Sequence, residues 1–178
     1  GFVDFSHEVS VIGARSAAGD VACFDPGENV HRNGILHSTT VPAKLSAGQR
    51  MDAVLLTAKI LNTLDYVGVM GVELFVTNDG LVVNEIAPRV HNSGHWTQNG
   101  CAIDQFEQHI RAVAGWPLGD GTRHSDVVME NLIGEDVLES ITGGGIDDAY
   151  EEDAFNAIVL GNYISGEAVP LSADPSLL

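Results

Sequence analysis

The chain has 178 residues, of which 44% are hydrophobic, 25 are acidic and 8 are Lys or Arg. This composition is typical of a folded protein with one good core or two small subdomains. The formal net charge of −17 argues against nucleic acid or an anionic membrane surface as a partner. No apolar run approaches the ~18–20 residues that a membrane span needs.

The negative charge is concentrated toward the C-terminal end. All 8 Lys and Arg residues lie within residues 1–123, whereas residues 124–178 hold 12 acidic residues and no Lys or Arg. Cys23 and Cys101 are too few for a disulfide scaffold or a four-cysteine zinc site, which favours a reducing, cytoplasmic compartment. The chain starts at Gly1 in strand-like sequence without a signal-peptide pattern, so we expect a piece of a longer protein.

The first third of the chain predicts two strands followed by a helix. Alternating side chains predict strands over residues 5–15 and 21–24. Residues 28–34 are polar and are predicted to form a loop. Ser46 is a typical N-cap for a helix over 47–64. Six apolar residues at helical spacing are predicted to form its buried stripe: Met51, Val54, Leu55, Ala58, Leu61 and Leu64.

A hairpin is the most informative prediction in the middle of the chain. Strands over 66–77 and 81–87 flank an Asn-Asp-Gly turn at 78–80, and Pro88 ends the second strand. A polar loop over 89–100 follows. A second helix, capped by Asp104 and ended by Gly115, is predicted to bury Phe106, Ile110 and Val113. Further strands are predicted over 127–133 and 155–160, around the glycine run 143–145.

This order of elements predicts an α+β fold. Consecutive strands joined by short turns imply antiparallel pairing rather than a doubly wound parallel sheet. We expect a domain over 1–120 and a small, β-containing C-terminal domain over 121–178. Neither a Walker A loop nor a Gly-x-Gly-x-x-Gly loop is present in the sequence, so the two commonest phosphate-binding loops are absent.

Two carboxylates of the hairpin are candidate metal ligands. If the turn is a three-residue loop with a left-handed Gly80, then Glu73 faces Glu85, and strand alternation places Glu85 beside Val83. Facing carboxylates repel by about 0.2–1 kcal/mol, and a divalent cation such as Mg²⁺ removes that conflict. Asn84 could support the same site. In the alternative register, shifted by one residue, one Glu faces solvent and no metal is needed.

The loop after the hairpin concentrates hydrogen-bond donors. Arg89 offers a fork for phosphate or carboxylate, and His91, Asn92 and Ser93 suit an anionic or hydroxylated ligand. A zinc-protease site is disfavoured because no Glu follows His91. A polar loop that satisfies its own hydrogen bonds is the alternative.

Three residues outside the hairpin and its loop are weaker candidates. Glu8 and His31 could be ligands or ordinary surface residues. Arg15 could bind phosphate or pair with a carboxylate.

The residues that carry these candidates resemble one family. The run from Asn84 to Trp96 reads Asn-Glu-Ile-Ala-Pro-Arg-Val-His-Asn-Ser-Gly-His-Trp, and Gln-Phe-Glu-Gln-His follows from Gln105. With matching segments upstream and downstream, residues 5–137 resemble 5-(carboxyamino)imidazole ribonucleotide synthase, an ATP-grasp ligase of purine synthesis. The resemblance implies the C-terminal half of an ATP-grasp fold.

The resemblance also implies a reaction, in which ATP and bicarbonate carboxylate 5-aminoimidazole ribonucleotide through carboxyphosphate. Mg²⁺ or Mn²⁺ would be held by Glu73 and Glu85, and ATP would be contacted by Glu8, His31, Asn84 and Glu85. The ribonucleotide would be bound by Arg89, His91, Asn92 and Ser93, of which Arg89 and His91 would be catalytic. Homodimers are common in this family.

The chain also departs from the family pattern. The family's amino-terminal domain and nucleotide-binding lysines precede the point that matches Gly1, and its C-terminal phosphate-binding Lys and Arg have no counterpart in 124–178. We therefore expect no turnover from this chain alone. The alternatives are a sibling ATP-grasp enzyme, such as the formate-using glycinamide ribonucleotide transformylase, or a non-catalytic interaction module.

Overall fold

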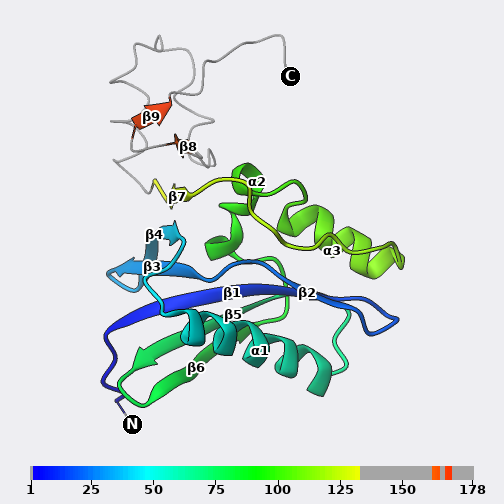
Figure 1. Ribbon diagram of the computed structural model, residues 1–178, viewed down its shortest axis with the longest axis horizontal. Helices are drawn as coiled ribbons and strands as arrows, with labels where there is room; N and C mark the ends of the chain where they lie inside the picture. The colour runs from blue at the N-terminus through cyan, green and yellow to red at the C-terminus, as the bar shows by residue number, and fades with distance from the viewer. Residues whose placement is uncertain (1, 133–161, 165–166, 170–178) are drawn as a thin grey trace.

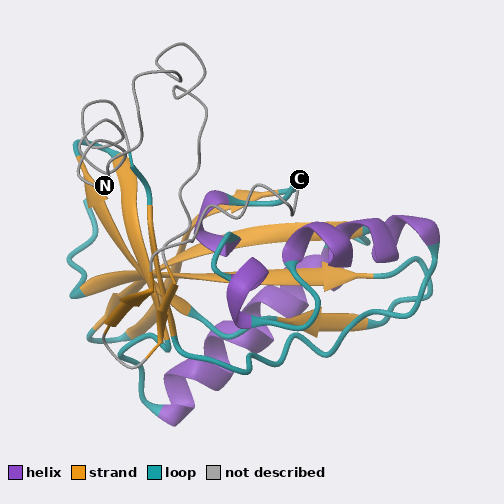
Figure 2. Ribbon diagram, turned by 90° about the horizontal axis from the view of Figure 1, so that it is seen from above, coloured by secondary structure: helices purple, strands orange, loops and turns teal. Residues whose placement is uncertain are grey.

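The computed structural model describes residues 2–132, 162–164 and 167–169 (Figure 1). Seven strands form one sheet in the order β6-β5-β1-β3-β4-β7, with β2 paired to β1, and every pairing is antiparallel. Figure 2 shows the strand directions rotating across the sheet, as right-handed strand twist requires. The strands are β1 (His7–Arg15), β2 (Val21–Cys23), β3 (Gly27–Arg32), β4 (Ile35–Val41), β5 (Gly68–Thr77), β6 (Gly80–Ala87) and β7 (Val127–Glu130).

The helices are α1 (Ala47–Thr63), α2 (Thr97–Gly100) and α3 (Gln105–Ala114), with a 3-10 turn η1 (Asn92–Gly94) before α2. Strands β8 (Asn162–Ile164) and β9 (Glu167–Val169) form a separate antiparallel pair. The antiparallel sheet with few helices confirms the α+β prediction. The division at residue 120 stays a prediction, and the strand over 155–160 and the glycine run 143–145 lie outside the described residues.

The two faces of the sheet have different covers. Val9, Val11 and Leu74 belong to a core that also contains Ala53 and Leu61 of α1. Ile12 and Val69, from the opposite face, share a second core with Trp96 of the segment between η1 and α2. Figure 1 shows α1 on one side of the long strands and α3 on the other.

Residues 28–34 are not a loop, which corrects the prediction. They form most of β3 and the turn that leads to β4, Asn33-Gly34, with φ of 53° and 76°. Asn-Gly is the strongest short hairpin signal, since both residues tolerate positive φ. The usual pattern of apolar residues inside and polar residues outside is reversed in β3. Its polar Asn29 is buried and hydrogen bonded, while its apolar Val30 is 45% exposed.

Helix α1 starts where the sequence predicts. The Ser46 side chain accepts a hydrogen bond from the backbone N–H of Gln49, and the Gln49 side chain accepts one from the backbone N–H of Ser46, which completes a capping box. The predicted buried stripe is wrong in part: of its six members only Leu61 is buried, and Met51, Leu55 and Leu64 are exposed. The buried face is narrower and consists of Ala53, Thr57 and Leu61.

Close approach to the sheet explains this small-residue face of α1. A Cβ added at Gly13 of β1 would lie 2.8 Å from both Thr57 and Leu61. The helix therefore packs directly over a glycine, and a side chain at Gly13 would collide with this face of the helix.

Helix α3 has its cap at Asp104 and its left-handed stop at Gly115, as predicted. Its predicted inward face is wrong, however, because Phe106, Ile110 and Val113 are all exposed. The buried residues are instead Gln105, Gln108 and Ala112. Buried glutamines need hydrogen-bond partners, and the loops that α3 covers supply them.

Within the described residues, no helix is long and apolar enough to cross a membrane.

Candidate functional site

Glu73 and Glu85 face each other across β5 and β6, as predicted. The route to this register differs from the prediction. The turn is the two-residue Asn78-Asp79, with Thr77 paired to Gly80, and a β-bulge then shifts the pairing between Leu74–Val83 and Glu73–Glu85. Asn84 is the extra residue of that bulge. Without it, Glu73 would face Asn84, so the bulge is what aligns the two carboxylates.

The bulge also corrects the predicted alternation on β6. Val83 is paired with Leu74, whereas Glu85 is paired with Glu73. Leu74 and Glu73 are consecutive and point to opposite faces of the sheet. Glu85 therefore shares the face of Glu73 rather than that of Val83.

Two further predicted residues approach the carboxylate pair from the neighbouring strands. The Glu8 Oε2 atom lies 2.5 Å from Nδ1 of His31, which joins β1 to β3. Both side chains are largely buried, with exposed fractions of 22% and 26%. The charges of both residues act on Glu73, so the structure brings these predicted ligands into one cluster.

The surroundings of the Glu73 carboxyl group disfavour its charged form. Its side chain is 14% exposed. Burial raises its pKa above the ordinary 4.5, and the carboxylates of Glu85 and Glu8 raise it further. His31 and a long 3.5 Å hydrogen bond from Asn84 Nδ2 act in the opposite direction. A divalent cation between Glu73 and Glu85 would remove this conflict, so the donor set fits the predicted metal.

His91 lies against the same carboxylate. Its Nε2 atom is 3.8 Å from Glu73 Oε1, and its side chain is 11% exposed. Its Nδ1 atom accepts a hydrogen bond from the Ser93 backbone N–H and lies 2.8 Å from Ser93 Oγ. We assign the proton of the neutral ring to Nε2, because Nδ1 serves as an acceptor.

The pKa of His91 is lowered below its usual range, first by burial and then by the positive charge of Arg89. The ring is therefore neutral near pH 7. Nε2–H points toward Glu73 at a distance longer than a hydrogen bond. It can donate to a ligand oxygen that lies beside the Glu73 carboxylate.

The remaining predicted loop residues differ in exposure. Arg89 is exposed and donates one hydrogen bond to the carbonyl of Val90. Ser93 is fully buried, and the buried Oδ1 atom of Asn92 has no hydrogen-bond partner among the described residues. The side chains of Arg89 and Asn92 therefore keep polar groups that could bind a ligand, whereas Ser93 mainly orients His91.

Arg15 and His95 make structural contacts outside the carboxylate cluster. Arg15 pairs with Asp65 at 2.5 Å and donates to Asn62, so the carboxylate-pairing alternative describes it. His95 stacks on Phe106 with ring centroids 5.7 Å apart. In the part of the chain that the structure describes, no group of three or more His, Cys, Asp or Glu side chains is arranged to hold a metal. A carboxylate pair that shares Mg²⁺ with phosphate oxygens needs only two.

Sequence reasoning missed a buried polar network beneath the site. Asn29 Oδ1 accepts from Thr39 Oγ1 at 2.9 Å and from Ser10 Oγ at 3.4 Å. Ser10 is the register partner of Glu73. Strand alternation places Ser10 on the same face as Glu8, so it could have indicated that Ser10 lies near the site. No such signal was available for Asn29, because residues 28–34 were predicted to form a loop.

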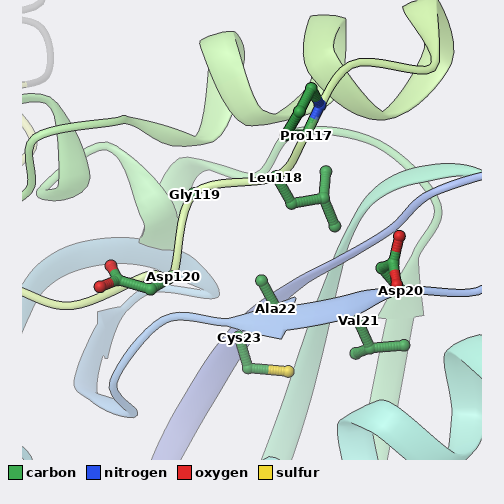
Figure 3. A pocket seen from close by; sticks show the side chains of 8 residues that line it. All are labelled: Asp20, Val21, Ala22, Cys23, Pro117, Leu118, Gly119 and Asp120. Carbon is green, nitrogen blue, oxygen red and sulfur yellow. The ribbon is translucent and has the colours of Figure 1, made fainter.

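A pocket of about 530 Å³ lies away from this cluster, between β2 and residues 117–120 (Figure 3). It contains none of the predicted site residues. Cys23 lines it, and burial raises the pKa of this thiol to about 12, so the thiol stays protonated and is a poor nucleophile.

Residues 1–106 match the model of the ATP-grasp domain, so the chain belongs to the ATP-grasp family. It is 62% identical over 138 residues to the N5-carboxyaminoimidazole ribonucleotide synthase of Brucella melitensis, and 47% identical over 135 residues to that of Escherichia coli. These matches confirm the resemblance stated from the sequence.

Solved structures give the same result. The chain is similar to an ADP complex of N5-carboxyaminoimidazole ribonucleotide synthetase, with a TM-score of 0.77, 42% identity and coverage of 80% of this chain and 38% of that one. It is also similar to the Aspergillus clavatus synthase in complex with ADP and 5-aminoimidazole ribonucleotide, with a TM-score of 0.75, 29% identity and coverage of 83% and 42%.

The matched region is only part of each relative. The alignment with the Brucella enzyme covers 77% of this chain and 38% of that protein, and the alignment with the E. coli enzyme covers 76% and 38%. The chain thus spans less than half of the length of the enzymes it matches.

Proposed function

We propose that this chain forms part of a cytoplasmic ATP-dependent ligase of de novo purine synthesis. The enzyme would use ATP and bicarbonate to carboxylate 5-aminoimidazole ribonucleotide, giving the carboxyamino product, ADP and phosphate. The observation that carries the proposal is the facing pair Glu73–Glu85 beside the neutral His91. The names of the similar proteins supply the substrate class.

Glu73 and Glu85 would hold Mg²⁺ or Mn²⁺ against the phosphates of ATP. The ion would neutralise charge on the transferred phosphoryl group, where two anions must meet. The buried position of Glu73 suits it for this role, since burial disfavours its charged form and a cation would offset that cost.

Glu8, His31, Asn84 and Glu85 would contact the nucleotide. Glu8 Oε2 and His31 Nδ1 lie 2.5 Å apart, and Asn84 lies at the bulge next to Glu85. These residues come from β1, β3 and β6 of one sheet, in which only β5 lies between β6 and β1, so they would present a preorganised polar surface to ATP.

Arg89, His91 and Asn92 would bind the ribonucleotide and the carboxyphosphate intermediate, and the buried Ser93 would act by orienting His91. A bicarbonate oxygen attacks the γ-phosphorus as the bond to ADP breaks. The amine nitrogen then attacks the carboxyl carbon of carboxyphosphate, phosphate leaves and the nitrogen gives up a proton. Arg89 would neutralise the phosphate charge, and His91 Nε2–H would donate to a developing oxyanion. Carboxyphosphate hydrolyses readily, so the site must exclude water.

The composition of the C-terminal residues bears on how complete the site is. Residues 124–178 contain no Lys or Arg, although the substrate carries a phosphate. We therefore propose that the isolated chain has no turnover. We also propose a homodimer as the working assembly, on the basis of the family resemblance alone. The same acidic tail favours a second candidate, a non-catalytic module that retains the fold.

A chimera tests the proposal. The matched residues of this chain would replace the corresponding 138 residues of the Brucella enzyme, and ADP release would be measured with and without bicarbonate and 5-aminoimidazole ribonucleotide. We expect ADP release that depends on both substrates. A folded chimera that binds Mg²⁺–ATP without such turnover would support the non-catalytic module instead.

A further inference from the structure

The buried face of α3 consists largely of side-chain amides that hold loops. Gln105 and Gln108 are both 0% exposed. Gln105 Oε1 accepts from the His91 backbone N–H at 2.9 Å, and Gln105 Nε2 donates to the His91 carbonyl at 2.8 Å. Gln108 makes the same pair of bonds to Gly119, both at 2.8 Å. Each glutamine thus satisfies both backbone groups of one loop residue.

The two hydrogen bonds between Gln105 and His91 fix the backbone from which the His91 side chain extends. With its backbone held on both sides, His91 stays extended, with φ of −127° and ψ of 147°, and serves as the N-cap of η1. From that position Nδ1 accepts from Ser93 N–H and Nε2 lies 3.8 Å from Glu73. The orientation of the ring therefore depends on a backbone that Gln105 fixes.

Gln105 is itself held tightly. Its backbone N–H donates to Thr97 Oγ1 at 3.0 Å, and that hydroxyl donates to the Gly94 carbonyl at 2.6 Å. A Cβ added at Gly94 would lie 2.5 Å from Gln105 Oε1. The Gln105 carboxamide therefore packs directly against the backbone of η1 and is restricted to that position.

Close packing holds the opposite side of His91. A Cβ added at Gly71 of β5 would lie 2.8 Å from His91 Cβ. His91 is thus confined between the β5 backbone and the Gln105 carboxamide.

We infer that Gln105 is a positioning residue for His91: its two hydrogen bonds to the His91 backbone hold the imidazole in the Nε2–H tautomer, directed toward Glu73. The inference deepens the proposed function, and its importance for turnover rests on that function. The geometric part concerns only the described residues and is tested without substrate.

The test uses ¹⁵N-labelled full-length chain and the imidazole nitrogen shifts of His91, at a pH well above the ordinary His pKa of about 6.5. Gln105→Met keeps the size of the side chain and removes both hydrogen bonds, while Gln105→Glu keeps the acceptor. The matched control is Gln108→Met, which removes an equivalent pair of bonds from the same helix, at Gly119.

We expect wild type and Gln108→Met to show two well-separated nitrogen shifts, typical of a single tautomer. In Gln105→Met, both shifts should move toward the average of the two tautomers, and Gln105→Glu should fall between. Unchanged shifts in both Gln105 variants would overturn the inference. Equal changes in Gln105→Met and Gln108→Met would also overturn it, since a general loss of stability would then explain both.

The chimera separates this inference from the proposed function. If His91 is catalytic, His91→Asn and Gln105→Met should each lower kcat, and the double variant should lower it no further than His91→Asn alone. If His91→Asn keeps full kcat while the nitrogen shifts respond to Gln105, the proposed role of His91 fails and the positioning remains. Additive losses in kcat would overturn the claim that Gln105 acts through His91.

Discussion

Glu73 lies directly opposite Glu85 because the bulge at Asn84 inserts one residue into β6. Regular antiparallel pairing from the Asn78-Asp79 turn would leave the two carboxylates out of register. Bulges are common next to functional sites, where they redirect a side chain. Two like charges aligned at the edge of the sheet weaken the fold, and a cation bound between them, as proposed, would offset that cost.

Glu73→Gln should make the protein more stable at neutral pH, by about 0.2–1 kcal/mol, the cost of facing like charges. Burial, and then Glu85 and Glu8, raise the pKa of Glu73 in the folded state above its ordinary 4.5. Protonation of Glu73 therefore contributes its full share of the unfolding free energy below about pH 4.5. That share is lost as the pH rises through the pKa of Glu73 in the folded state.

Urea unfolding over a pH series measures this effect. Wild type and Glu73→Gln should be similar at low pH and diverge as pH rises. Glu107→Gln is the control, since Glu107 is half-exposed and pairs with Arg111 on the surface of α3. A Glu73→Gln variant less stable than wild type at neutral pH would show that the charge is stabilising.

Gly71→Ala should displace His91 and cost about 1–3 kcal/mol of unfolding free energy, because the new methyl group overpacks the site. The nearest atoms are Cβ and Cγ of His91, close to its backbone. Gly13→Ala is the matched control, because its methyl group meets the ends of Thr57 and Leu61 on the opposite face. Both variants should lose stability in urea, but only Gly71→Ala should shift the His91 resonances. His91 resonances that match wild type in Gly71→Ala would argue against the close contact.

Ser46→Ala should lower the unfolding free energy by about 1 kcal/mol, because it removes the side-chain acceptor that caps α1. Urea unfolding measures the loss. Ser46→Asp restores an acceptor and should recover most of it. If Ser46→Ala matches wild type, the capping box contributes nothing to the stability of α1.

Both cysteines should resist alkylation in the folded protein. Burial raises the pKa of the Cys23 thiol to about 12, and burial followed by the charge of Asp25 raises that of Cys101 to about 12. Iodoacetamide reacts with thiolates, so mass spectrometry should find both thiols unmodified at neutral pH and modified in urea. Rapid labelling of folded protein at Cys23 would show that this side chain is accessible and ionised.

The sequence predicted the carboxylate pair more reliably than its geometry. Glu73 and Glu85 were placed opposite each other through a three-residue turn, whereas the structure combines a two-residue turn with a bulge. The two errors compensate. A bulge at a polar residue such as Asn84 has no periodic signal, because alternation assumes an unbroken ladder.

The helices show the limit of hydrophobic periodicity. Phe106, Ile110 and Val113 follow helical spacing, but α3 turns them outward and buries Gln105 and Gln108. Hydrogen bonds to His91 and Gly119 decide this orientation, and such long-range partners are not visible in a local pattern. Local capping signals at Ser46 and Asp104 were predicted correctly, because a cap depends only on neighbouring residues.

The most direct test of the central claim is where a paramagnetic cation binds. Mn²⁺ in the presence of ATP should broaden the amide signals around Glu73 and Glu85 in the NMR spectrum of the full-length chain. Glu73→Gln combined with Glu85→Gln should abolish that broadening, while Glu107→Gln should leave it intact. We expect the broadening to be strongest in β5 and β6 and to extend to the adjacent strand β1 and the loop of His91. Broadening that persists in the double variant, or that centres elsewhere, would contradict the proposed cation site.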